Sequence, residues 1–241
     1  MLVALVCSTA VHAWDTVALA PVQDNTLYEI PEGADELSNG AGDFLFTGRA
    51  GLDAGFRLRR ALLRFDLSAI PAGATIRHVE LVLHQSNAAP GSPPAAMGLY
   101  RALQAWGEGD SEGIGAEGQG NLATPGDATW FHRLYPDVAW DTVGGSYAVA
   151  ASSSVTVAQA LGPYTWPCTA ALVGDLQAWL DAPASHFGWV LAGGEEGGYS
   201  AHRFNSREHF TPAERPVLRV QYQPPGTVLA DGFEDPPVCP E

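Results

Sequence analysis

Short apolar–polar alternation, repeated along the chain, is the feature that most constrains its fold. In the segments 59–67, 75–84 and 217–223, the alternate residues that share one face are apolar, and most of the others are polar. Because successive side chains of a strand point to opposite faces, this period predicts strands with one buried face. The sequence IPAGA at 70–74 predicts a turn between the first two segments. We therefore predict an all-β fold, a jelly-roll-like antiparallel β-sandwich.

The segment 169–183 has a different period and predicts one short helix at the edge of the sandwich. Thr169 can cap the start of this helix, and Pro183 ends it. The apolar residues spaced for one helical face are Leu172, Leu176, Trp179 and Leu180. That face is expected to pack on the strands.

The composition fits a single acidic domain. The chain has 241 residues, of which 46% are hydrophobic, and this suffices for one large β domain, which we place at 14–223. The formal net charge is −15, and every basic residue is an arginine. Nucleic acids and anionic membranes attract basic surfaces, so neither is expected as a partner. No segment approaches 18 apolar residues, so membrane insertion is not expected.

The two ends of the chain predict export. Residues 1–13 are mostly apolar and end in Val11, His12 and Ala13, a small-x-small cleavage pattern, so we predict a signal peptide and a secreted protein. The alternative is that this segment forms a buried first strand. Residues 224–241 form a Pro-rich, acidic C-terminal tail.

Cleavage after residue 13 would leave two cysteines, Cys168 and Cys239. An even number of cysteines in an exported protein predicts a disulfide. The alternative is a pair of free thiols, one of them in the tail.

Several segments together resemble a known family of domains. They are QDNTLYE at 23–29, LSNGAGDFLFTGR at 37–49, RRALLRFDLSAIPAGATI at 59–76, GDATWFH at 126–132, WDTVGGSY at 140–147, WLDAPASHFGWVL at 179–191 and RFNSREH at 203–209. Their order and spacing resemble the bacterial secreted DNRLRE-domain group and are similar to carbohydrate-binding module family 96. The resemblance spans roughly 24–223. It implies a jelly-roll β-sandwich in an extracellular setting, beside glycan-active or surface-protein domains.

A structural Ca²⁺ is the one cofactor that the residues suggest. Jelly-roll binding modules commonly hold Ca²⁺ through carboxylate and carbonyl oxygens. The residues that could supply such oxygens are Asp24, Asn25, Glu29, Asn39 and Asp43. The alternative is turn chemistry, because Asn and Asp favour turns without any metal. Scattered histidines and the lack of paired-ligand motifs argue against zinc.

The segment 206–209 has the most reactive composition. A catalytic interpretation makes Glu208 a general acid or base, with Glu195 or Glu196 as the second carboxylate. We prefer a structural interpretation, because no second catalytic partner can be placed and alternate residues of a strand face opposite ways. In this interpretation charged side chains pair across the sheet, since buried charges need partners. The structural residues are Arg64, Asp66, Arg207 and Glu208. No nucleophile motif is present.

Sugar-binding sites place aromatic rings against sugar faces and add polar groups that orient the ligand. The aromatic candidates beside loops are Trp106, Trp130, Tyr135 and Trp140, with His132 and Arg133 as polar partners. For each ring, burial in the core is the alternative. We predict a secreted, non-catalytic module that binds polysaccharide or a surface glycan. The alternatives are a structural or adhesive surface protein and, third, a polysaccharide lyase or glycosidase.

Overall fold

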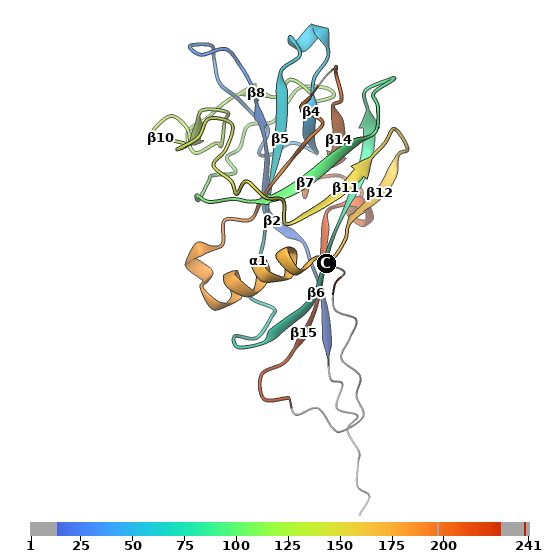
Figure 1. The fold of residues 1–241 in the computed structure, drawn as a ribbon. Coiled ribbons are helices and arrows are strands. Elements are labelled where there is room, and N and C mark those ends of the chain that lie inside the picture. Colours follow the sequence, from blue (N-terminus) through green and yellow to red (C-terminus); the bar gives the residue numbers. More distant parts are fainter. Residues whose placement is uncertain (1–13, 197, 228–238, 240–241) are drawn as a thin grey trace, which may run out of the picture.

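The computed structural model describes residues 14–196, 198–227 and 239, and it is dominated by antiparallel strands (Figure 1). The predicted signal peptide and most of the predicted tail lie outside the described residues. The strands are β1 (Asp15–Leu19), β2 (Pro21–Tyr28), β3 (Leu37–Ser38), β4 (Phe44–Arg49), β5 (Leu58–Phe65), β6 (Thr75–Ala88), β7 (Ala95–Arg101), β8 (Asn121–Leu122), β9 (His132–Leu134), β10 (Val138–Ala139), β11 (Ser153–Val157), β12 (Gly162–Trp166), β13 (Trp189–Gly193), β14 (His202–Asn205) and β15 (Val217–Gln223). The α-helix α1 spans Ala170–Asp181.

Eleven of these strands form one curled antiparallel sheet. Its order is β1-β15-β6-β14-β4-β5-β13-β7-β11, with β12 also pairing with β6 and β2 also pairing with β5. Strand β4 joins the two halves, because Phe44–Asn205 and His202–Thr47 are pairs with β14, whereas Gly48 pairs with Arg59 of β5. The halves pack face to face, which confirms the predicted all-β, sandwich-like fold.

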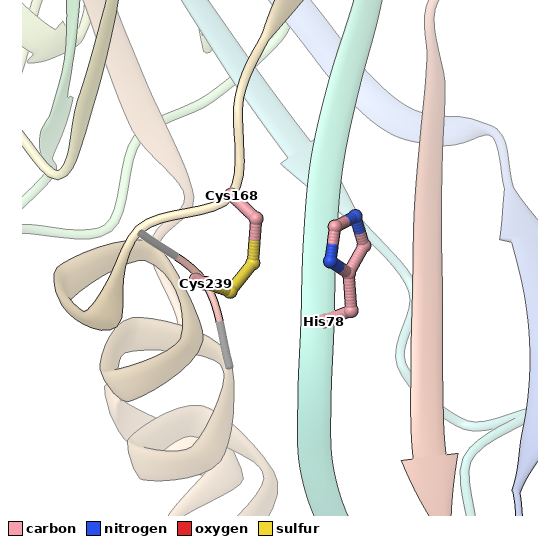
Figure 2. Close-up of side chains that lie close together, drawn as sticks. All are labelled: His78, Cys168 and Cys239. Atoms are coloured by element: carbon pink, nitrogen blue, oxygen red, sulfur yellow. A yellow bond between two sulfur atoms is a disulfide. The ribbon is translucent and has the colours of Figure 1, made fainter. Parts of the chain in front are cut away.

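The helix begins where the sequence predicts. The Thr169 hydroxyl accepts a hydrogen bond from the backbone N–H of Leu172 at 3.0 Å, as an N-cap should. Beside the start of the helix, Cys168 is paired with Cys239 at disulfide distance, with Cα atoms 5.2 Å apart and His78 of β6 next to them (Figure 2). The pair fixes residue 239 to the sandwich, 71 residues further along the chain.

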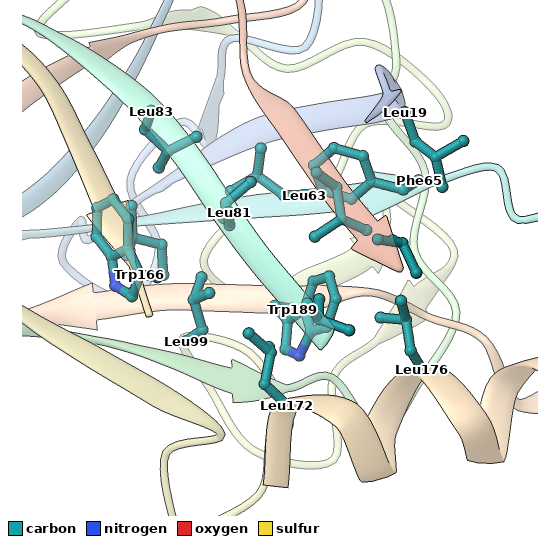
Figure 3. Packing of buried hydrophobic residues seen from close by; sticks show 14 of the residues in the cluster. Leu19, Leu63, Phe65, Leu81, Leu83, Leu99, Trp166, Leu172, Leu176 and Trp189 are labelled. Atoms are coloured by element: carbon teal, nitrogen blue, oxygen red, sulfur yellow. The ribbon is translucent and has the colours of Figure 1, made fainter. Parts of the chain in front are cut away.

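The main core lies between the two halves of the sheet. Leu63 of β5 and Leu81 of β6 meet there, and the helix adds Leu172 and Leu176 from one side (Figure 3). The apolar face predicted for 59–67 enters this core through Ala61, Leu63, Phe65 and Leu67. The apolar faces predicted for 75–84 and 217–223 enter it as well, so these alternation patterns are confirmed.

A second core covers the outer face of one half. The chain between β7 and β11, residues 102–152, folds over Leu27 of β2, Leu62 of β5 and Val190 of β13. Its three tryptophans pack on these side chains; they are Trp106, Trp130 and Trp140. At its centre, strand β5 is therefore buried on both faces, through Leu62 and Leu63. In the described part of the chain, no helix is long and apolar enough to cross a bilayer.

Candidate functional site

The three tryptophans predicted to stack on sugar are core residues. Their exposed fractions are 5% for Trp106, 7% for Trp130 and 5% for Trp140. Two of the indole N–H groups donate inward, from Trp106 to the Phe187 carbonyl and from Trp140 to the Thr129 carbonyl. The prediction that these rings stack on a ligand is therefore corrected: they bury the face of β5 and β13 instead.

The other three predicted ligand residues lie together at β9. The His132 Nδ1 atom is 2.8 Å from a carboxylate oxygen of Glu36, and its ring packs edge-on against Tyr135 at 5.7 Å between centroids. Arg133 donates to the Ala105 carbonyl. All three side chains are half-buried: Glu36 binds His132, the Ala105 carbonyl accepts from Arg133, and the Tyr135 ring packs against His132.

An open groove with two aromatic rings lies instead on the outer face of β7 and β13. It encloses about 660 Å³ and includes Tyr100, near the end of β7. It also includes Tyr147, which belongs to residues 102–152, the segment that covers the outer face and that we call the covering segment. The ring centroids are 5.3 Å apart with an interplanar angle of 50°. Both rings are half-buried, and neither hydroxyl makes a hydrogen bond to a described residue. We refer to this site, which also includes Arg60, Glu195 and Glu196, as the tyrosine groove.

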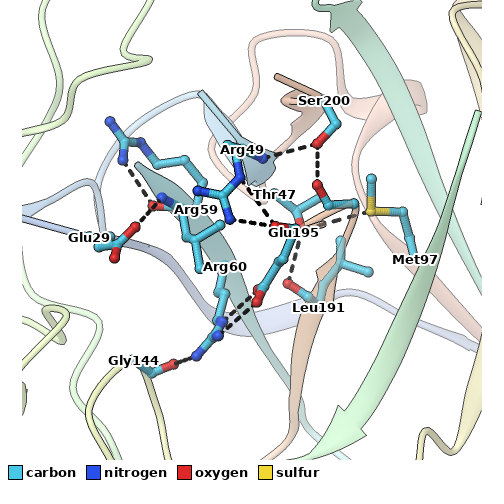
Figure 4. Close-up of polar contacts among 12 residues, drawn as sticks. Glu29, Thr47, Arg49, Arg59, Arg60, Met97, Gly144, Leu191, Glu195 and Ser200 are labelled. Atoms are coloured by element: carbon cyan, nitrogen blue, oxygen red, sulfur yellow. Dashed lines mark hydrogen bonds and ion pairs between the residues drawn. The ribbon is translucent and has the colours of Figure 1, made fainter. Parts of the chain in front are cut away.

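Two of the charged side chains of the tyrosine groove, Arg60 and Glu195, hold each other in place. Arg60 binds the Glu195 carboxylate with two hydrogen bonds of 2.7 and 2.8 Å and donates a third to the Gly144 carbonyl (Figure 4). Its guanidinium lies 5.3 Å from the centre of the Tyr147 ring. Glu196 is exposed. A planar, doubly hydrogen-bonded Arg–carboxylate pair is geometrically specific, so it fixes the guanidinium beside the Tyr147 ring.

The ionisation of these groups follows from their surroundings. Burial raises the pKa of Tyr147, and Glu195 adds to this by repulsion, so its hydroxyl remains protonated and can donate to a ligand. Burial alone would lower the pKa of Arg60, but the hydrogen bonds and charge of Glu195 raise it. Glu195 therefore favours the charged form of Arg60, and the exposed Glu196 adds a negative charge at the rim of the groove.

The residues predicted to bind Ca²⁺ do not converge on one point. The Asn25 side chain is buried and fully used, donating to Ser38 and to the Glu108 carbonyl. Asn39 donates to Glu117 and to the Phe44 carbonyl. The Glu29 carboxylate accepts from the backbone N–H of Leu58, and Asp43 is linked to Glu117 through its own backbone N–H. The side chains of Asn25, Asn39 and Glu29 thus have the loop-fixing role that was the alternative, whereas Asp43 contributes its backbone N–H.

The fifth residue, Asp24, lies in a cluster of acidic side chains. Oxygens of Asp24, Glu108 and Glu208 lie within 4.8 Å of one another, and Arg207 contacts both glutamates through Nε, at 2.6 and 2.8 Å. We refer to this set as the carboxylate cluster. Burial raises the pKa of Asp24 well above its usual value, and repulsion by Glu208 adds to the effect.

The predicted ion pairs across the sheet are wrong in their partners. Strand β14 ends at Asn205, so residues 206–209 form a turn in which Arg207 and Glu208 point toward the same cluster. Arg64 donates to Gln23, and Asp66 accepts from the backbone and hydroxyl of Ser68. Alternation of faces holds only within a strand, and here the strand has already ended.

The carboxylates of the catalytic alternative lie in different sites. Glu195 is bound to Arg60 in the tyrosine groove, whereas Glu208 belongs to the carboxylate cluster. The structure therefore does not bring together the pair that a glycosidase interpretation of Glu195 and Glu208 requires.

Sequence reasoning missed the residues that complete both sites. Tyr100, Tyr147 and Arg60 lie far apart in the sequence and meet only because the covering segment returns over β7. Glu108 lies in the Gly-rich acidic stretch 107–126, where its charge gave no sign of a specific partner. No protein-family model matches the sequence, and no curated protein matches it either. The resemblance to the DNRLRE-domain group therefore stays a prediction.

Proposed function

We propose that this chain is a secreted glycan-binding protein and that the tyrosine groove is its binding site. The observation that carries the proposal is the pair of half-buried rings, Tyr100 and Tyr147, in an open cavity of about 660 Å³. Sites for small ligands typically combine such a volume with aromatic walls and a few fixed polar groups. Glu195 and Glu196 supply acceptors, and the two phenols supply donors.

The charge of the groove favours a neutral polysaccharide. The positive charge of Arg60 is already compensated by Glu195, and Glu196 adds a negative charge at the rim. A polyuronate would meet repulsion there, since like charges brought together cost free energy. The chain as a whole carries −15, which acts in the same direction.

Secretion belongs to the same proposal. The disulfide-distance pair of Cys168 and Cys239 is consistent with an oxidising, extracellular compartment. The apolar segment at 1–13 and the resemblance to secreted DNRLRE-domain proteins support it from the sequence.

Native gel electrophoresis in the presence of polysaccharides tests the proposal. We expect the full chain to be retarded by at least one neutral glycan, such as a β-glucan or a galactomannan, and not by a polyuronate. Tyr100→Ala and Tyr147→Ala should each weaken binding roughly tenfold or more, as expected for a central aromatic contact. Phe210→Ala removes an exposed ring outside the groove and should bind like the parent.

A third variant changes the groove without removing an aromatic ring. A Cβ atom at Gly98 would lie 2.7 Å from Cε2 of Tyr100, so Gly98→Ala must displace that ring. We expect binding to weaken about 3- to 10-fold while the variant remains folded. Absence of retardation by every glycan, or equal retardation of the parent and both tyrosine variants, would refute the tyrosine groove as a glycan site.

A further inference from the structure

The carboxylate cluster is assembled from three distant segments of the chain. Asp24 comes from β2, Glu108 from the segment that covers the outer face, and Glu208 from the turn after β14. The backbone ties them together: the N–H of Asp24 donates to Glu108 at 2.8 Å, and the N–H of Arg207 donates to Asp24 Oδ2 at 2.8 Å. The positions of the carboxylates are therefore fixed by the fold.

Two oxygens of this cluster have no partner among the described residues. Asp24 is completely buried, and its Oδ1 atom accepts no hydrogen bond. The Oε2 atom of Glu208 is buried and unpaired as well. A buried carboxylate oxygen without a partner costs free energy, so such groups are expected to bind a cation, a proton or water.

The charge balance of the cluster points to a divalent ion. Among the described residues, one guanidinium contacts this cluster: that of Arg207, which binds Glu108 and Glu208, while Asp24 accepts from the Arg207 backbone N–H. The ionised cluster therefore retains two negative charges. Arg215 lies nearby, but it donates to the backbone carbonyls of Glu208 and His209. One divalent cation would compensate the remaining charge.

We infer that Asp24 Oδ1 and Glu208 Oε2, together with Glu108, form a binding site for Ca²⁺. The donors are all hard oxygens, which suit Ca²⁺ or Mg²⁺ rather than zinc. Ca²⁺ accepts six to eight oxygens in flexible geometry, whereas Mg²⁺ demands a nearly ideal octahedron. The three carboxylates come from a strand, a loop and a turn, and such a mixed set suits the more flexible geometry of Ca²⁺. Glu108 and Glu208 are partly exposed, so water can complete the coordination shell of the ion.

The experiment uses the full chain after dialysis against a chelator. Isothermal titration with Ca²⁺ should show one site, and thermal unfolding should shift upward on adding Ca²⁺. At about 100 times the Kd, we expect the Tm to rise by roughly 5–10 °C. Mg²⁺ at the same concentration should give a smaller shift.

Matched variants assign the effect to this cluster. Asp24→Asn and Glu208→Gln keep the shape of each side chain and remove its charge, so we expect folded proteins that bind no Ca²⁺. Asp53→Asn removes an exposed carboxylate elsewhere and should keep the full shift. Three results would overturn the inference: no heat and no shift with Ca²⁺, an unchanged shift in both cluster variants, or an equal or larger shift with Mg²⁺.

Discussion

His202 is a buried titratable residue whose surroundings make stability depend on pH. It lies on β14 with no exposed surface, and its Nδ1 atom is 2.6 Å from the Gln85 side-chain oxygen. Its Nε2 atom has no partner among the described residues. Burial lowers the pKa of His202, so the folded protein keeps this ring neutral to a lower pH than the unfolded chain does.

The direction of the pH effect follows from proton binding. Below about pH 6.5, the ordinary histidine pKa, the unfolded state binds a proton at this position that the folded state does not bind. The contribution of His202 to stability is therefore complete above about pH 6.5 and is lost as the pH falls toward the lower folded pKa. We expect the free energy of unfolding, measured in urea, to fall between pH 7.5 and pH 5.

A variant isolates this residue from other titrating groups. His202→Gln retains a donor for Gln85 and cannot gain the proton, so its stability should depend less on pH than that of the parent. His84→Gln, which removes a half-buried histidine on the neighbouring strand β6, is the matched control for the loss of a histidine. Identical slopes for the parent and His202→Gln would contradict the prediction.

At the level of single residues, the sequence shows which side chains are apolar but not what they contact. The apolar character of Trp106, Trp130 and Trp140 is plain, but each is compatible with burial or exposure. They are buried because the covering segment, the 51 residues 102–152, packs on the outer face of β5 and β13, over Leu62 and Val190. No local sequence pattern predicts this burial, since it depends on which face of the sheet the covering segment packs against.

At the level of elements, the helix α1 is the clearest success of sequence reasoning. Its cap, its buried face and its end all follow from local chemistry, and the structure confirms them. The Thr169 hydroxyl accepts a hydrogen bond from the N–H of Leu172 and donates one to the Ser152 carbonyl. The second bond connects the helix to the end of the covering segment. The helix packs on β6, so fraying at its start would loosen the main core.

The cap therefore has a measurable energetic role. We expect Thr169→Ala to lower the free energy of unfolding by about 1 kcal/mol, within the range of about 0.5–2 found for such caps. Thr169→Ser keeps the capping oxygen and should recover most of this loss. Urea denaturation of the three proteins gives the comparison, and equal stability of the Ala and Ser variants would show that the hydroxyl does not stabilise the helix.

Strands β5, β6 and β15 were also predictable from their period, but the polar sites were not. Strand β5 shows the limit of prediction from periodicity. Leu62 interrupts its polar face, and periodicity alone does not indicate that this residue belongs to a second core. The turn after β14 shows another, because 206–209 continue the polar composition of a strand end and yet bend to bring Arg207 and Glu208 together. Such a bend depends on tertiary partners such as Glu108.

At the level of the whole molecule, the pair of Cys168 and Cys239 joins the start of the helix to the far end of the chain. Both residues are almost fully buried, and the Cys168 sulfur also accepts from the backbone N–H of Val79 on β6. A cross-link that closes a loop of about 71 residues restricts the unfolded chain far more than the folded one. Its stabilisation is therefore expected to be large.

Reduction of this pair should destabilise the protein by about 4 kcal/mol in the chain-entropy account. We expect a reductant to lower the urea midpoint of the parent, and Cys168→Ser/Cys239→Ser to show the lower midpoint with or without reductant. The double variant is the control, because any effect of the reductant that persists in it does not come from this bond. If the parent is unaffected by reductant and titrates as two free thiols, the pair is not a covalent bond in solution, and the argument from the disulfide for an extracellular location fails with it.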